Sequence, residues 1–210
     1  RRMFVAPDEN HVLIDADYSQ IELRVLAHIS QDEHMIEAFK HGQDIHAATA
    51  AKVYHVPLEE VTPQMRSSCK AVKFGIVYGI SDFSLAQDIG VTRKEAGEFI
   101  KTYLDTYPGV KKYMEDIKQT GREQGYVTTL FGRRRALPEL KSKTFNMRSF
   151  GERVAMNTPI QGTAADIIKI AMVRVRDRLL RDGLQSRLIL QVHDELILEA
   201  PKDEQETAMH

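Results

Sequence analysis

The stretch DADYSQIELR, residues Asp15–Arg24, is the point around which this chain is organised. The apolar run Val12-Leu13-Ile14 leads into it and predicts a buried strand, which stops at Asp17. Immediately afterwards, apolar residues recur at every fourth position and predict a helix: Ile21, Val25 and Ile29. A carboxylate between a strand and a helix is well placed to hold a divalent cation.

A second carboxylate is needed, because one Asp does not bind a hard cation with useful affinity. The sequence supplies it at Asp194, where Val192-His193-Asp194-Glu195 separates the apolar runs Leu188–Val192 and Leu196–Leu198. This pattern predicts a β-hairpin with acids at its tip. For either Asp alone, a solvated turn residue is the simpler interpretation. The motifs between Asp17 and Asp194, described below, favour a cation-binding site.

The composition restricts the classes of protein to which this chain can belong. Its 210 residues suffice for one large domain or two small ones, and its net charge of −1 gives no overall attraction for polyanions. Nucleic-acid binding would depend on local clusters, such as Arg133-Arg134-Arg135 and the set Arg66, Lys70 and Lys73. The single Cys69 excludes an internal disulfide and a zinc site built from several cysteines. No apolar run approaches the ~20 residues of a membrane span.

Helix start and stop signals predict a helical block between two strand-forming ends. The expected helices cover residues 19–39 with a break at 30–32, 44–54, 62–78, 81–88, 92–107 and 108–124. Asp44 is expected to cap the helix at 44–54, and Thr92 with Glu95 to form a capping box. A small hairpin is expected at 126–137. We expect Pro159 to end a helix that begins at Phe145, and Thr163 with Asp166 to cap a second helix through Leu180.

The helix predicted from Thr62 carries two cations followed by two aromatic rings, spaced four residues apart: Arg66, Lys70, Phe74 and Tyr78. Such a stripe suits a nucleotide that lies along the helix, because cations bind phosphates and rings stack on base and sugar. A neighbouring apolar stripe is expected to pack inward: Met65, Cys69, Val72 and Ile76. By itself, the pattern also fits an ordinary amphipathic helix with a solvated basic edge.

Four motifs together resemble the family A DNA polymerases. They are DADYSQIELR, RSSCKAVKFGIVYG (Arg66–Gly79), NTPIQGTAADI (Asn157–Ile167) and QVHDE (Gln191–Glu195), and the similarity extends over essentially the whole chain. The resemblance implies an α+β fold of the right-hand polymerase type, in which a palm with an antiparallel sheet carries an inserted helical fingers subdomain. It implies palm at 1–40, fingers at 41–135 and the second part of the palm at 136–210. Because the chain begins with Arg1, we interpret it as a fragment. The resemblance implies a thumb upstream of it and more palm downstream.

The resemblance also implies a template-directed DNA polymerase, which adds deoxyribonucleotides to a primer 3′-hydroxyl in replication and repair. Asp17 and Asp194 resemble the two carboxylates that bind a pair of Mg²⁺ ions, which clamp the attacking and leaving oxygens. The backbone carbonyl of Tyr18 is the expected third ligand, and Glu195 is a weaker candidate for a catalytic role. Lys70 is the candidate proton donor to pyrophosphate.

Several residues resemble those that bind the incoming deoxyribonucleoside triphosphate: Gln20, Glu22, His46, Arg66, Lys70, Phe74 and Tyr78. Arg66 and Lys70 would grip the triphosphate, Phe74 would lie beside the sugar, and Tyr78 would stack near the template base. Glu22 resembles the acid that blocks a ribose 2′-hydroxyl, and we expect Tyr78 to hold it by a hydrogen bond. Without the resemblance, His46 fits equally well as a surface histidine of a helix.

Further residues resemble those that contact the primer–template minor groove (Arg153, Asn157 and Gln161) and the primer terminus (His193). Minor-groove acceptors are nearly common to all base pairs, so such contacts check shape without reading sequence. Because Pro159 lies between Asn157 and Gln161, we expect these two residues not to share one helix face. Asp15 departs from the family pattern, and a strand would place it on the same side as Asp17; it has no assigned role.

Two classes of function are compared at this point. One is a polymerase core that works as a monomer in the full-length protein, in the cytoplasm of a bacterium near the nucleoid and without a membrane. The other is a module that binds nucleotide or DNA without turnover, which the expected lack of a thumb favours for this piece alone. A metal-dependent nuclease or phosphatase is a third interpretation, but it leaves the stripe from Arg66 to Tyr78 without a purpose.

Overall fold

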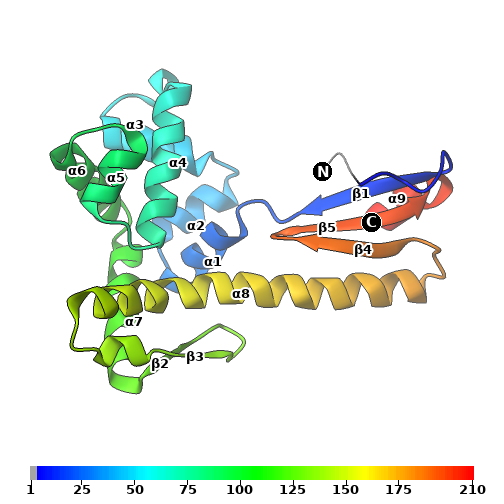
Figure 1. The fold of residues 1–210 in the computed structure, drawn as a ribbon. Helices are drawn as coiled ribbons and strands as arrows, with labels where there is room; N and C mark the ends of the chain where they lie inside the picture. The colour runs from blue at the N-terminus through cyan, green and yellow to red at the C-terminus, as the bar shows by residue number, and fades with distance from the viewer. Residues whose placement is uncertain (1–3) are drawn as a thin grey trace. The chain divides into compact units, whose positions relative to one another are not determined.

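The structure is a computed structural model that describes residues 4–210, except for the side chains of residues 71, 73, 74 and 77 (Figure 1). The chain forms two compact units. We call Arg1–Ile21 with Ala164–His210 the sheet unit, and Glu22–Thr163 the helical unit. The sheet unit therefore takes its residues from both ends of the chain. The boundaries proposed for palm and fingers, after residues 40 and 135, stay a prediction.

The sheet unit contains a three-stranded antiparallel sheet in the order β1-β5-β4. Its strands are β1 (His11–Asp17), β4 (Arg187–Val192) and β5 (Glu195–Pro201). The central strand β5 alternates strictly, and Leu196, Leu198 and Ala200 are buried. The strand predicted before Asp17 and the hairpin predicted at Asp194 are both confirmed, but the strand was expected to be buried, and Val12, Leu13 and Ile14 are only half-buried. A short helical turn, η3 (Lys202–Glu204), and α9 (Gln205–Met209) follow β5.

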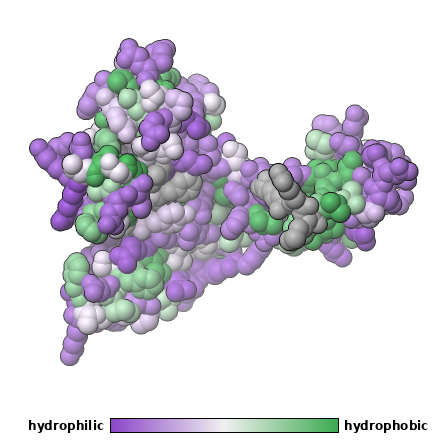
Figure 2. Space-filling view, turned by 45° about the horizontal axis from the view of Figure 1, so that its top comes forward, coloured by the Kyte–Doolittle hydropathy of each residue, from purple (hydrophilic) through white to green (hydrophobic). Residues whose placement is uncertain are grey.

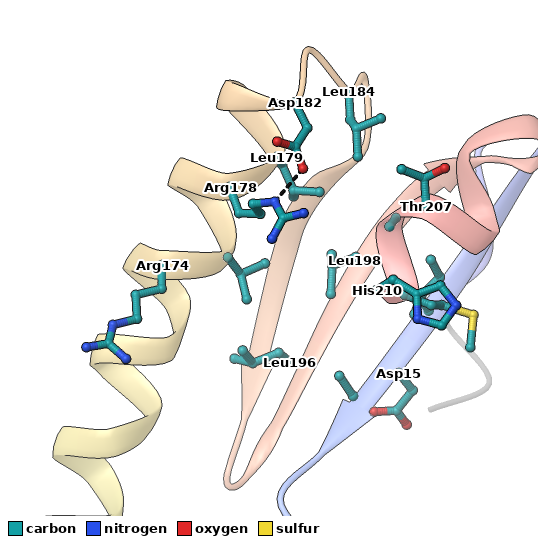
Figure 3. A pocket seen from close by; sticks show the side chains of 15 residues that line it. Asp15, Arg174, Arg178, Leu179, Asp182, Leu184, Leu196, Leu198, Thr207 and His210 are labelled. Atoms are coloured by element: carbon teal, nitrogen blue, oxygen red, sulfur yellow. Dashed lines mark hydrogen bonds and ion pairs between the residues drawn. The ribbon is translucent and has the colours of Figure 1, made fainter.

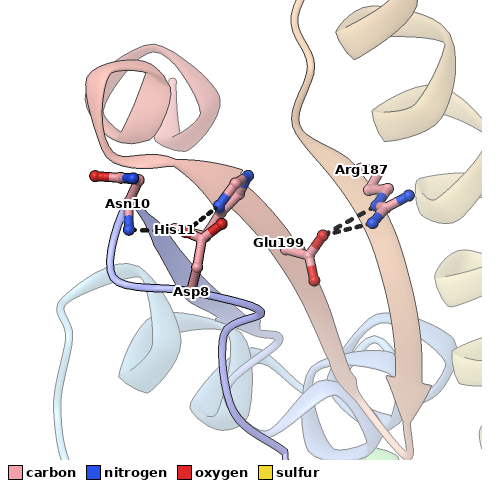
Figure 4. A network of polar contacts seen from close by, with 5 residues as sticks. All are labelled: Asp8, Asn10, His11, Arg187 and Glu199. Atoms are coloured by element: carbon pink, nitrogen blue, oxygen red, sulfur yellow. Dashed lines mark hydrogen bonds and ion pairs between the residues drawn. The ribbon is translucent and has the colours of Figure 1, made fainter.

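Polar contacts lie across the sheet and in the turn that precedes it (Figure 4). Arg187 lies opposite Glu199, and its Nη2 and Nε donate to Glu199 Oε1 over 2.8 and 3.0 Å. Before β1, Asp8 Oδ1 accepts from the His11 ring and from the Asn10 N–H, both at 2.8 Å. The hydrogen bond from His11 contributes most to holding the pKa of Asp8 below its usual value. These contacts close the turn that leads into the sheet.

The helical unit begins with a series of short helices joined by tight loops. They are α1 (Ile21–Ser30), α2 (Glu33–Lys40), α3 (Ile45–Tyr54), η1 (Leu58–Glu60), α4 (Pro63–Val77), α5 (Asp82–Ile89), α6 (Arg93–Thr106) and α7 (Pro108–Gln124). The capping signals in the sequence explain these boundaries. Asp44 caps α3, and Thr92 with Glu95 forms the predicted capping box of α6.

The apolar stripe of α4 packs inward as predicted. Cys69, Val72 and Ile76 are buried, and Met65 packs against a core cluster of Ala50, Val53 and Cys69. A second cluster lies under the predicted small hairpin, which consists of β2 (Tyr126–Thr128) and β3 (Arg134–Ala136), and under the following turn η2 (Pro138–Lys141). Its buried members are Val127, Leu137, Leu140 and Ala155.

The prediction for residues 145–180 is wrong, because α8 (Phe145–Arg181) is one continuous helix of 37 residues with Pro159 inside it. A proline in a helix interior removes one N–H and costs about 3 kcal/mol. Buried residues on both sides of it fix the helix through tertiary packing, which outweighs that local cost: Ala155, Met156 and Ile160. Thr163 does not cap a helix; its hydroxyl accepts from the Leu130 N–H at 3.0 Å. Within the described residues, no helix is both long and apolar enough to cross a membrane.

Candidate functional site

The acids of the sheet unit meet at one end of the sheet. Asp17 is the last residue of β1 and lies opposite Glu195, the first residue of β5. Asp194 follows His193 in the two-residue turn between β4 and β5, and the Tyr18 N–H donates to the Asp194 carbonyl at 3.1 Å. His193 has a φ of 53°, the left-handed conformation that so tight a turn requires. The structure thus places Asp17 beside the turn that carries Asp194 and Glu195, although this turn lies more than 170 positions later in the sequence.

These residues have the right chemistry for a hard divalent cation, which prefers oxygen ligands. The Asp17 side chain is exposed and that of Asp194 is half-buried, so both are accessible. The Tyr18 carbonyl accepts from the Ile21 N–H at 3.3 Å and keeps a second lone pair for a cation. Among the residues that the structure describes, no three His, Cys, Asp or Glu side chains are already gathered as a metal cage. Asp17, Asp194 and the Tyr18 carbonyl therefore fit an incomplete cation site, in which a bound substrate would supply the remaining oxygen ligands.

In the helical unit, Tyr78 donates a hydrogen bond to Glu22, with 2.6 Å between the phenol oxygen and Glu22 Oε2. This contact was expected from the sequence and is confirmed. Burial, followed by the hydrogen bond to the Glu22 carboxylate, raises the pKa of Tyr78 to about 12, while a hydrogen bond with Gln161 acts in the opposite direction. The phenol is therefore protonated at neutral pH and keeps Glu22 in one place.

The end of α4 explains how Tyr78 reaches this position. The Gly79 and Ile80 N–H groups donate to the carbonyls of Ile76 and Gly75, at 2.9 and 2.8 Å, which is a Schellman motif. Gly79 has a φ of +68°, and a Cβ on it would lie 2.8 Å from Arg153 Cγ. The glycine thus permits both the turn and the close approach of α8.

The continuous helix α8 corrects the prediction for the groove-contact residues. Arg153, Asn157 and Gln161 are four residues apart in one helix and share one face. Arg153 Nη1 donates to Ser149 Oγ at 3.3 Å, and both residues line a cavity of about 670 Å³ together with Tyr78 and Gly79. Within the described structure, the buried Asn157 Oδ1 has no hydrogen-bond partner. The face of α8 that carries Arg153, Asn157 and Gln161 therefore places polar groups beside Tyr78.

Arg66 lies near the start of α4, where its Nε donates to Asp44 Oδ2 at 2.6 Å. Burial raises the pKa of Asp44, but hydrogen bonds from Arg66 and from the Ala47 and His46 N–H groups outweigh it and lower the pKa. Asp44 was predicted only as a helix cap, and the sequence carries no signal that it also binds Arg66. The side chain of His46 is 3% exposed, so its interpretation as a surface histidine is wrong.

The remaining predicted residues lie at the surface or outside the described part. Lys70 is exposed on α4, and Gln20 is exposed between β1 and α1 with a φ of 57°. Backbone alone is described for Phe74, so its predicted place beside the sugar lies outside the described residues.

Asp15 lines a largely apolar cavity of about 400 Å³ in the sheet unit, to which α8 and α9 contribute Arg174, Arg178 and Thr207 (Figure 3). Arg178 Nε is paired with Asp182, another lining residue, which directly follows the end of α8. Asp17 does not line this cavity, although alternation along β1 puts both acids on one face. Asp15 is thus set apart from the metal-binding candidates.

The chain therefore combines an antiparallel sheet that carries acids at a hairpin with a helical unit that holds a tyrosine–carboxylate pair. The sequence profile of DNA polymerase family A matches residues 1–210, and the chain belongs to this family. It is 59% identical over 206 residues to DNA polymerase I of Bacillus caldotenax and 60% identical over 204 residues to that of Bacillus subtilis (strain 168). These matches cover 98% and 97% of this chain but 24% and 23% of the relatives.

A solved structure supports the same assignment. The POL domain of Pol1 from M. smegmatis, in complex with DNA primer-template and dNTP, has 44% sequence identity and a TM-score of 0.92. The match covers 97% of this chain and 36% of that one. The α+β fold expected from the sequence is confirmed.

Proposed function

We propose that this chain forms the part of a DNA-directed DNA polymerase that binds the incoming deoxyribonucleotide and joins it to a primer 3′-hydroxyl. The observation that carries the proposal is the meeting of Asp17, Asp194 and Glu195 at one end of the sheet. The relatives' name, DNA polymerase I, and the DNA and dNTP in the similar structure support it. The chain spans about a quarter of the length of these relatives, so the proposal concerns the longer protein to which such a chain contributes.

Asp17, Asp194 and the Tyr18 carbonyl would hold two Mg²⁺ ions. When bound, such ions stabilise charge on the attacking and leaving oxygens of an in-line displacement. Glu195 lies opposite Asp17 and adds negative potential at the same end of the sheet. The carboxylates would also hold the reacting groups in line, which is a large part of phosphoryl-transfer catalysis.

The nucleotide would lie along α4. Arg66 and Lys70 would bind the triphosphate, with Lys70 donating a proton to the departing pyrophosphate, and His46 and Gln20 would help to place it. Phe74 would lie beside the sugar, and Tyr78 would stack near the template base. Glu22, held by Tyr78 at 2.6 Å, would occupy the space of a ribose 2′-hydroxyl and favour deoxyribonucleotides.

The primer–template would contact the polar face of α8 through Arg153, Asn157 and Gln161, with His193 near the primer terminus. Contacts of this type read the shape of the minor groove, because its acceptors are shared among base pairs. We further propose that the longer protein acts as a monomer near the bacterial nucleoid in replication and repair.

Primer extension tests this function in a polymerase of the relatives' length that contains these 210 residues. Asp17→Ala and Asp194→Ala are expected to lower extension by at least about a hundredfold, because charge stabilisation at the reacting oxygens is lost. Asp15→Ala is the matched control, since it removes an acid from the same face of β1 but not from the proposed site. Extension by the first two variants at the wild-type rate, in saturating Mg²⁺, would refute the assignment.

The competing interpretation is a module that binds nucleotide or DNA without turnover. It predicts tight nucleotide binding by the wild type and no extension with all four deoxyribonucleotides and Mg²⁺. Degradation of the primer in place of extension would instead indicate a nuclease.

A further inference from the structure

The hairpin β2–β3 carries a concentration of positive charge that the proposed function leaves unused. The segment Tyr126–Leu137, YVTTLFGRRRAL, contains three arginines and no acid, whereas the whole chain has a net charge of −1. Residues Arg133, Arg134 and Arg135 are all exposed. A local cluster of this kind attracts a polyanion even though the protein as a whole does not.

The tip of the hairpin is apolar and turned toward solvent. Leu130 and Phe131 are 54% and 56% exposed, which is unusual for adjacent large apolar residues. They occupy the central positions of a turn closed by the bond from the Gly132 N–H to the Thr129 carbonyl at 3.0 Å. Gly132 has a φ of 79°, as the residue after such a turn requires. The turn geometry therefore forces both side chains outward.

The hairpin is held firmly, so the tip has a defined position. Thr129 is buried, and its hydroxyl accepts from the Arg133 N–H at 3.2 Å. The Leu130 N–H is bonded to Thr163 of α8, and the Thr129 methyl group lies against Gly162, where a Cβ would come within 2.5 Å of it. A surface fixed in this way loses little entropy when it binds.

One arginine is already arranged for binding. The guanidinium of Arg134 lies over the ring of Tyr126, 4.8 Å from its centroid, on the outer face of the hairpin. Stacking on a ring leaves the planar edge of a guanidinium able to donate to a phosphate. The hairpin contacts α8 at Gly162 and Thr163, which lie about 100° and 200° around the helix axis from Gln161. The hairpin therefore lies on a different face of α8 from Arg153, Asn157 and Gln161.

We propose that this hairpin is a second nucleic-acid contact, which binds a single-stranded segment of the template: Arg134 binds a phosphate, and Phe131 stacks on an unpaired base. Phosphates alone would suit a duplex equally well, but an exposed ring at a rigid tip is useful only where bases are unstacked. The inference rests on the proposed function, because the strand belongs to the same primer–template.

The test compares two DNA ligands in a polymerase of the relatives' length that contains these residues: a primer–template with a single-stranded template extension, and a blunt duplex. Phe131→Ala is expected to weaken binding of the extended ligand by about 5- to 150-fold, the range for loss of one stacked base, and to leave the blunt duplex unchanged. Phe131→Tyr keeps a ring and should bind like the wild type. Phe131→Leu keeps an apolar tip without a ring and should behave like Phe131→Ala.

Arg134→Gln is expected to reduce the slope of log affinity against log salt by about 1 for the extended ligand. Lys112→Gln is the control, because it removes an exposed cation of the helical unit that is already paired with Asp116. Primer extension by the same samples separates the two proposals. Normal extension with unchanged affinities in all hairpin variants would overturn the hairpin proposal alone, and would leave the apolar tip as a contact for another protein. Absence of both extension and DNA binding in the wild type would overturn both proposals.

Discussion

Two buried tyrosines of the helical unit differ in whether their hydroxyl groups are hydrogen bonded. Within the described structure the Tyr103 hydroxyl has no partner, whereas the Tyr113 hydroxyl donates to the Met156 carbonyl at 2.9 Å. Burial raises the pKa of both phenols, so both are protonated at neutral pH. A buried hydroxyl without a partner is costly, while a bonded one contributes to stability.

Tyr103→Phe is therefore expected to leave the free energy of unfolding unchanged or to increase it. Tyr113→Phe removes one hydrogen bond from a ring that is also buried, and should lower that free energy by about 0.5–1.5 kcal/mol. Urea unfolding of the two variants and the wild type measures the difference. Equal losses in both would mean that the Tyr103 hydroxyl has a partner after all.

The pair formed by Tyr78 and Glu22 gives a prediction about sugar selection. Glu22→Ala should lower the ratio of kcat/KM for deoxyribonucleotides over ribonucleotides roughly tenfold or more, because the space for a 2′-hydroxyl opens. Tyr78→Phe keeps the ring but releases the carboxylate, so it should cause a smaller loss in the same direction. Steady-state incorporation of the two nucleotides is the measurement, and an unchanged ratio in Glu22→Ala would contradict the steric role.

The pKa of Tyr78 sets the pH range of this contact. Its value in the folded chain, about 12, lies above the usual value of 10.0. The stabilisation that accompanies this shift is therefore fully present below about pH 10 and is lost as the pH rises through 12. Selection against ribonucleotides should accordingly stay constant between pH 7 and pH 9.

At the scale of single residues, the sequence predicted a contact where both partners belong to motifs shared with the family. The contact between Tyr78 and Glu22 was predicted in this way. The pairing of Arg66 with Asp44 was not, because Asp44 has a complete local explanation as a helix cap. The burial of His46 was missed for a related reason, since a polar residue in a helix gives no sign that a neighbouring element covers it.

At the scale of elements, the end of α4 depends on Gly79. Gly79 and Gly90 have similar positive φ values, +68° and +70°, but only Gly79 has atoms close to the place of a Cβ: Met156 Cε at 2.6 Å and Arg153 Cγ at 2.8 Å. Gly90→Ala should lower the free energy of unfolding by about 1–2 kcal/mol, the cost of placing an alanine in the left-handed conformation. Gly79→Ala should cost more and displace Arg153 from its place beside Tyr78.

Denaturant unfolding of Gly79→Ala and Gly90→Ala separates the backbone cost from the steric cost. In a polymerase of the relatives' length, Gly79→Ala should also weaken binding of a primer–template, whereas Gly90→Ala should not. Identical effects of the two substitutions would show that the approach of α8 to Gly79 does not matter.

The helix boundaries could be predicted wherever a cap or a stop signal acts alone. Asp44, Thr92 and Gly125 mark real ends. Pro159 was misleading, because its local preference competes with burial on both sides, and burial depends on elements that a local pattern does not reveal. The error mattered for the site, since it separated Asn157 from Gln161, which lie on one helix face.

At the scale of the whole molecule, the two units differ in how their cores are assembled. The helical unit is continuous in sequence, Glu22–Thr163, and buries its apolar stripes among its own helices. The sheet unit joins strands from both ends of the chain, and its sheet has β1 and β4 as edges. Figure 2 shows green apolar residues exposed among purple ones on the face in view.

Several of the exposed apolar residues belong to the sheet unit. Val173 and Leu180 of α8 are 58% and 61% exposed, and Ile189 and Val192 of the edge strand β4 are 41% and 36% exposed. An open strand edge beside apolar side chains favours association between chains. The 210 residues alone are therefore expected to self-associate as concentration rises. Sedimentation over a range of concentrations measures this, and Val173→Glu with Leu180→Glu should suppress it.

The 210 residues alone are also expected to bind a primed DNA weakly and to extend it poorly. Affinity for DNA depends on the number of phosphates neutralised, and in this chain 30 Asp and Glu residues offset the 29 Lys and Arg residues. Titration of a labelled primer–template at two salt concentrations should give an affinity that falls steeply with salt. Unfolding of the same sample tests whether the chain is folded under these conditions. Tight binding at physiological salt, with extension at the rate of a polymerase of the relatives' length, would show that these residues suffice for the whole activity.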